Sequence, residues 1–112
     1  MVKDAKILLL GITFKENCPD VRNTKIVDIY NTLTEYTRNI TVYDPWANAD
    51  VVRHEYGIDI VNELPEDKFD SVILGVAHKQ FLELDVKSLV KDGGVIYDVK
   101  GCLDRSIVDG RL

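Results

Sequence analysis

The sequence has little of what several common functions require. Its 112 residues include seven glycines, three prolines and two cysteines, and no apolar run approaches the roughly 20 residues needed to cross a bilayer. Basic residues are also in deficit, since 14 lysines and arginines face 19 aspartates and glutamates, for a net charge of -5 at pH 7. This balance opposes a general affinity for nucleic acid or for an anionic membrane, so any site for an anion must be local.

The few cysteines and histidines exclude several other kinds of site. A lone disulfide between Cys18 and Cys102 is unnecessary in so apolar a domain, and the N-terminus lacks the features of a signal peptide, so we expect a cytoplasmic protein with free thiols. Neither cysteine has a histidine near it in sequence to activate it as a nucleophile. His54 and His78 are too far apart for a zinc site, and we expect no bound metal. His54 is predicted on the surface, whereas His78 either lines a ligand site or has a structural role.

What the sequence does contain is a series of short apolar runs. Residues 7–12 form an unbroken run, which is typical of a central parallel strand covered on both faces. Similar runs, each rich in β-branched or aromatic residues, occupy residues 40–43, 58–61, 72–76 and 95–99. These five runs are predicted to be strands.

Helical patterns lie between the predicted strands. Apolar residues spaced three and four positions apart predict a helix over residues 26–33 and a second helix over residues 49–56. Asn23 or Thr24 can cap the first helix, and Gly57 can end the second. The two helices therefore have start and stop signals that agree with their periodicity.

The alternation of strands and helices predicts a single α/β domain over residues 1–112. Residues 78–91 add one or two shorter helical turns, which are expected to stop at Gly93-Gly94. Because parallel strands connect by right-handed crossovers, we expect a Rossmann-like, doubly wound sheet of about five parallel strands with helices on both faces. Such sheets bind ligands at the carboxyl ends of their strands.

Two common kinds of site at the carboxyl edge of such a sheet, a dinucleotide site and a phosphoacceptor site, fit this sequence poorly. A dinucleotide fingerprint needs three glycines after the first strand, whereas only Gly11 is present, and Asp44 lies beyond the usual spacing of about 20 residues. Asp44-Pro45 is instead interpreted as a turn that leads into the second helix. A phosphoacceptor receiver domain would use a lysine such as Lys100 after the fifth strand, but it also needs clustered carboxylates to hold a cation, and Asn62 follows the third strand.

The loop after the first strand has side-chain cations where the glycines would be. Lys15 can bind a phosphate as a point charge, and Arg22 can bind one with two parallel hydrogen bonds from its guanidinium group. Both interactions are charge-assisted hydrogen bonds. Alternatively, both cations are solvated and pair with Glu16 and Asp20. Phe14 is either a plug of the core or a platform for a base or ribose.

Three stretches together resemble a known family. The runs GITFKENCPDVRNTK, VYDPWA and YDVKG make residues 6–112 similar to the C-terminal domain of the UDP-glucose/GDP-mannose dehydrogenase family. The form FKENCPD most resembles the branch that oxidises UDP-N-acetylglucosamine or UDP-N-acetylgalactosamine for surface polysaccharides. The family pattern Gly-x-x-Phe-Lys-x-x-x-x-Asp-x-Arg is matched by Gly11, Phe14, Lys15, Asp20 and Arg22.

The resemblance implies one part of a larger enzyme. Enzymes of this family oxidise the C6 alcohol of the sugar to an acid, using two NAD molecules and a covalent thiohemiacetal on a cysteine of the preceding domain. Neither Cys18 nor Cys102 has the Gly-x-Cys setting of that nucleophile, so we expect no catalytic residue in this chain and no activity from the chain alone. The implied partners are a UDP-N-acetylhexosamine, an NAD-binding domain of the same protein and, in a homodimer, a second copy.

Three site residues follow from matching positions in the family, and a fourth candidate stands where the sequence departs from the family. Phe14 and Lys15 resemble residues that contact the UDP-sugar, and Arg22 resembles one that reaches NAD bound mainly by the neighbouring domain. The UDP-glucose branch has two arginines after the fifth strand, where this chain has Lys100-Gly101, and Lys100 is the candidate replacement. The alternative function is a stand-alone regulatory module of the same fold that binds a nucleotide or a sugar nucleotide.

Overall fold

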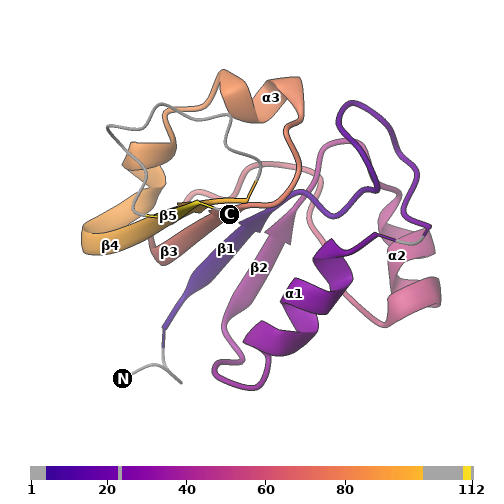
Figure 1. Ribbon diagram of the computed structural model, residues 1–112, viewed down its shortest axis with the longest axis horizontal. Helices are drawn as coiled ribbons and strands as arrows, with labels where there is room; N and C mark the ends of the chain where they lie inside the picture. Colours follow the sequence, from indigo (N-terminus) through magenta and orange to yellow (C-terminus); the bar gives the residue numbers. More distant parts are fainter. Residues whose placement is uncertain (1–4, 23, 100–109, 112) are drawn as a thin grey trace.

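The computed structural model describes residues 5–22, 24–99 and 110–111, and within them it has a parallel five-stranded sheet with helices on both faces (Figure 1). The strand order is β2-β1-β3-β4-β5. In chain order the elements are β1 (Ile7–Leu10), α1 (Ile26–Leu33), β2 (Ile40–Tyr43), α2 (Ala49–Tyr56), β3 (Phe69–Leu74), α3 (Lys79–Leu82), the 3-10 helix η2 (Val86–Leu89), β4 (Val90–Asp98) and β5 (Gly110–Arg111). The Rossmann-like fold class predicted from the sequence is confirmed.

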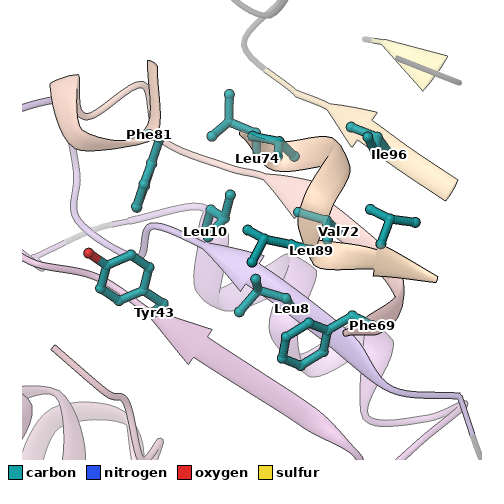
Figure 2. Packing of buried hydrophobic residues seen from close by; sticks show 11 residues of the cluster. Leu8, Leu10, Tyr43, Phe69, Val72, Leu74, Phe81, Leu89 and Ile96 are labelled. Carbon is teal, nitrogen blue, oxygen red and sulfur yellow. The ribbon is translucent and has the colours of Figure 1, made fainter. Parts of the chain in front are cut away.

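β1 is an interior strand of the sheet, buried on both faces. Its residues pair with β2 on one side and with β3 on the other. Leu8 and Leu10 pack into a cluster with Phe81 of α3 and Leu89 of η2, as Figure 2 shows. Leu9 packs into the opposite cluster, which contains residues of α1 and α2. The unbroken apolar run of β1 is therefore explained by two cores, one on each face of the sheet.

The strand order places a topological switch point between β1 and β3. From β1 the chain continues to α1 and then to β2, whereas from β3 it continues to α3 and then to β4, on the other side of the sheet. Because α1 and α3 belong to opposite faces, the connections that follow β1 and β3 diverge. Divergence of this kind opens a crevice at the carboxyl edge of a parallel sheet.

Several of the predicted strands differ in the structure. β1 ends at Leu10 rather than at residue 12, and β3 spans Phe69–Leu74 rather than residues 72–76. Residues 58–61 make only one bridge, between Val61 and Tyr43 of β2, and Ile58 packs into the cluster that contains residues of α1 and α2. Of the predicted strand 95–99, residues 95–98 are part of the longer β4, so the prediction that the helical turns stop at Gly93-Gly94 is wrong. η2 ends at Leu89, and both glycines lie inside β4.

An irregularity in the β3–β4 pairing explains how glycines lie within a strand. The register between these strands shifts between Phe69 and Ser71. A Cβ on Gly94 would lie 2.4 Å from Cγ1 of Val90 and 2.7 Å from the carbonyl oxygen of Asp70. The close approach of backbone at this bulge therefore requires glycine.

Both predicted helices are confirmed with the bounds expected. α2 is capped at its N-terminus by Asn48, whose side chain accepts the amides of Asp50 and Val51, and at its C-terminus by Gly57 in the left-handed conformation, φ +70°. Thr24 accepts the amide of Ile26 at 3.2 Å just before α1. Asn23, the other predicted cap, lies outside the described residues.

The short helix α3 is fixed to the sheet by Phe81, which gives a test of the cluster in Figure 2. Phe81 is fully buried and packs edge-to-face on Tyr43, with ring centroids 5.6 Å apart. Phe81→Ala is expected to lower the free energy of unfolding by about 3–5 kcal/mol, measured by urea denaturation, because it leaves a cavity in the core. Leu82→Ala, in the same helix at 53% exposure, is the control and should change little. If both variants lost the same free energy of unfolding, Phe81 would not be the residue that fixes α3 to the sheet.

Candidate functional site

A buried carboxylate lies where β1 and β2 end. Asp44 is fully buried, and one oxygen accepts the amides of Ile12 at 2.8 Å and Thr13 at 3.3 Å, just after β1. The other oxygen accepts the amides of Trp46 at 2.7 Å and Ala47 at 3.0 Å. The interpretation of Asp44-Pro45 as a turn is confirmed, and the same side chain also fixes the end of β1.

The carboxylate has a buried histidine as its side-chain partner. Nε2 of His78 lies 3.0 Å from Oδ2 of Asp44, and neither side chain is exposed. Burial by itself would raise the pKa of Asp44, but the hydrogen bonds from His78 and from the amides of Ile12 and Trp46 outweigh it and hold the pKa below its usual value. Asp44 is therefore an ionised carboxylate at neutral pH.

The bonds of His78 define its tautomer. Nδ1 accepts the backbone N–H of Asn17 at 2.8 Å, so this nitrogen has no proton. Nε2 therefore holds the ring proton. This nitrogen lies 3.0 Å from Oδ2 of Asp44 and 3.0 Å from the hydroxyl oxygen of Thr13. Of the two roles left open for His78, the structure supports the structural one, because the ring lies under the loop rather than on its surface.

The loop after β1 is closed by its own hydrogen bonds. The amide of Phe14 donates to the carbonyl of Asp20 at 2.6 Å, and the hydroxyl of Thr13 donates to the carbonyl of Lys15 at 2.9 Å. The hydroxyl of Tyr56, in α2, donates to the carbonyl of Val21. The loop is thus a folded element of the site and not an open connection.

A cavity of about 320 Å³ lies at the switch point between β1 and β3. It has walls from the loop after β1, from the start of α1 and from the turn after β3. Its lining residues are Thr13, Phe14, Thr24, Lys25, Ile26, Gly75 and Val76. A concave site of this size, with a few polar groups at the carboxyl edge of a parallel sheet, is where doubly wound folds bind ligands.

The structure brings one of the predicted site residues, Phe14, to this cavity. Phe14 lines it and is 54% exposed, so it is not a core plug. Lys15 follows directly and is exposed, and among residues 5–22 and 24–99 no ion pair involves it, so its predicted pairing with Glu16 is not formed. Lys100 and Cys102 lie outside the described residues.

Arg22 is held by an acidic neighbour, as the alternative interpretation predicted. Its Nε and Nη2 atoms donate to the carboxylate of Asp20 at 3.1 and 3.2 Å. The side-chain hydrogen bond from Arg22 is the main reason why the pKa of Asp20 is lowered. The Arg22 side chain is still 84% exposed, so its other edge faces solvent.

The residues that the sequence did not single out are those behind the loop. Asn17, Thr24 and Val76 contact or line the site. Asn17 and Thr24 lie within the stretch that resembles the family, but none of the three was predicted as a site residue. The only feature of the sequence that placed Asp44 and His78 near the site was their position, because each follows a predicted strand. Their pairing across the sheet was not predicted.

Other kinds of site are not supported by the described residues. Within that part of the chain no three His, Cys, Asp or Glu side chains are grouped to hold a metal, and no helix is long and apolar enough to cross a membrane. Cys18 is a partly exposed free thiol, and His54 is exposed on α2 as predicted.

The fold and the cavity define an α/β domain of the nucleotide-binding class. The sequence model described as the UDP-glucose/GDP-mannose dehydrogenase family, UDP binding domain, matches residues 8–105. This chain belongs to that family.

Three relatives illustrate the similarity. The chain is 42% identical to UDP-N-acetyl-D-glucosamine 6-dehydrogenase of Salmonella typhi and 46% identical to that of Pseudomonas aeruginosa, in each case over 99% of this chain and 27% of the relative. A UDP-glucose dehydrogenase structure from the archaeon Pyrobaculum islandicum is 26% identical with a TM-score of 0.77, over 98% of this chain and 25% of that one. The chain thus spans about a quarter of the length of these proteins.

Replacing the buried carboxylate tests its role in stability. Asp44→Asn is expected to lower the free energy of unfolding by about 3 kcal/mol at pH 7, because an amide cannot accept all of the bonds that the carboxylate accepts. The pKa of Asp44 is lower in the folded state, so its contribution is present above the unfolded pKa of about 3.9 and is lost as pH falls through the folded pKa. Urea denaturation between pH 7 and pH 2 should therefore show a shallower loss of stability in the variant.

The control for this comparison is Asp59→Asn. Asp59 is an exposed carboxylate bonded to Arg53, so the same chemical change should have little effect at pH 7. If both variants retain wild-type stability, Asp44 does not hold the strand ends together.

Proposed function

We propose that this chain is the sugar-nucleotide-binding domain of a UDP-N-acetylhexosamine 6-dehydrogenase. In the complete protein the C6 alcohol of the sugar is oxidised to a uronic acid, with reduction of two NAD molecules. The observation that carries the proposal is the cavity at the β1–β3 switch point, bordered by the loop that holds Phe14 and Lys15. The two bacterial relatives of highest identity described above, both named as UDP-N-acetyl-D-glucosamine 6-dehydrogenases, support the choice of substrate.

Within this function each loop side chain has a distinct role. Phe14 offers an exposed aromatic face at the cavity for the base or ribose. Lys15 supplies a positive charge to the diphosphate, and Lys100 is proposed as a further contact to the substrate. Arg22, with one edge of its guanidinium bonded to Asp20, directs its free donors toward NAD.

The rest of the enzyme lies outside this chain. NAD is bound mainly by a second domain of the complete protein, which also supplies the nucleophilic cysteine, and the complete enzyme is a cytoplasmic homodimer. The uronic acid serves the synthesis of a surface polysaccharide, such as a capsule. This arrangement is supported by the share of the relatives that the chain covers, about a quarter of their length.

The proposal is tested with the complete protein, UDP-sugars and NAD. UDP-N-acetylglucosamine or UDP-N-acetylgalactosamine should be oxidised with two NADH formed per sugar, and UDP-glucose should be a poorer substrate. No NADH formation with any UDP-sugar, together with no binding of UDP in calorimetry, would contradict the proposal.

Lys15 provides a test of the substrate contact. Lys15→Ala is expected to raise the KM for the UDP-sugar by about 10- to 100-fold, since a charge-assisted hydrogen bond contributes roughly 1.5–3 kcal/mol. Lys87→Ala, which removes an exposed lysine on η2, is the control and should leave the KM unchanged. Identical KM values for wild type and Lys15→Ala would remove Lys15 from the site.

Arg22 provides a separate test of the cofactor contact. Arg22→Ala is expected to raise the KM for NAD by about tenfold and to leave the KM for the UDP-sugar unchanged. Arg53→Ala is the matched control, because Arg53 is also an exposed arginine bonded to an aspartate. A change confined to the KM for the sugar would place Arg22 at the substrate instead.

A further inference from the structure

Asn17 is bound from two directions at the far end of the exposed part of the loop. Its backbone N–H donates to Nδ1 of His78, and its side-chain oxygen accepts the amide of Lys79, at the start of α3, at 2.8 Å. The residue is in the left-handed region, φ +55°, which asparagine adopts more readily than most residues. These two bonds fix the loop against α3 in a backbone conformation that it would otherwise seldom adopt.

One buried pair therefore holds both ends of the segment 14–16. At one end Asp44 accepts the amide of Thr13, and at the other end His78 accepts the amide of Asn17. Asp44 and His78 are themselves bonded to each other. Phe14, Lys15 and Glu16 between these anchors are exposed, so the core does not fix their positions.

We propose that His78 is a positioning residue for the sugar-nucleotide site. Its neutral imidazole, through the bond to Asn17, keeps the segment 14–16 in the shape that presents Phe14 and Lys15 to the ligand. This inference rests on the proposed function, because the segment is the one assigned to the substrate. His78 itself is buried beneath the loop and makes no contact with the substrate.

The two ring nitrogens can be replaced separately. Glutamine at position 78 places an N–H donor near the position of Nε2, which keeps the bond to Asp44, but it offers no acceptor at the position of Nδ1. Asparagine does the reverse, since its oxygen lies near the position of Nδ1 and can accept the amide of Asn17. The pair of variants thus separates the positioning bond from the bond within the core.

The complete protein with UDP-N-acetylglucosamine and NAD is the system for the test. His78→Gln is expected to raise the KM for the UDP-sugar by about tenfold and to leave kcat within about twofold of wild type. This is the effect expected when the hydrogen bond that holds the binding segment in place is lost. His78→Asn should have a KM within about threefold of wild type, even where urea denaturation shows it to be less stable. A role confined to folding predicts no change of KM in either folded variant.

His54→Gln is the matched control for the chemical change. His54 is exposed on α2, and this variant should retain both wild-type kinetic constants. Equal KM values for wild type and His78→Gln would overturn the proposal. A KM raised equally in His78→Gln and His78→Asn would also overturn it, because the acceptor for Asn17 would then not matter.

Hydrogen exchange of the unaltered protein tests the same bond without any variant. The amide of Asn17 should exchange at least tenfold more slowly than that of Glu16, although both residues are exposed in a loop. Equal exchange rates would overturn the positioning role even if both His78 variants failed to fold. If the complete protein did not bind UDP, the proposed function would fail on its own, while the exchange rates would still report on the bond.

Discussion

The ionised carboxylate of Asp44 is the interaction on which the rest of the site depends. A buried charge is costly unless it is satisfied, and here four backbone amides and one imidazole satisfy it. These donors come from the segments that follow β1, β2 and β3, so a single side chain joins three connections at the carboxyl edge of the sheet. The position of the β1 loop follows from this constraint.

Under the proposed function, this arrangement explains how a loop with one glycine can serve a phosphate site. Glycine-rich loops bring backbone amides to the anion, whereas in this loop the amides of Ile12 and Thr13 are already bonded to Asp44. In that proposal binding depends on side chains that project from a fixed backbone, and Phe14 and Lys15 are both exposed. Precision comes from the buried anchors, and the contacts come from the exposed residues between them.

Much of the fold was predictable because its signals are local. The apolar run of β1, the periodicity of α1 and α2, and Gly57 at the end of α2 each depend on neighbours in the sequence. The wrong assignments depended on distant partners. Residues 58–61 have the composition of a strand, but pairing with β2 extends to one bridge, and the glycines of β4 are accommodated only by the bulge opposite β3.

The sequence by itself determined the class of the domain, its family and the identity of the loop cations, because periodicity and a spaced motif are properties of consecutive residues. Only the tertiary structure decided whether each of these side chains has an ion-pair partner within the described residues. Arg22 is paired with Asp20 and Lys15 is exposed, although both are cations of one loop. The hydrogen bond between Asp44 and His78 also required the fold. Residues this far apart in the chain become neighbours only when parallel strands bring their carboxyl ends to one edge of the sheet.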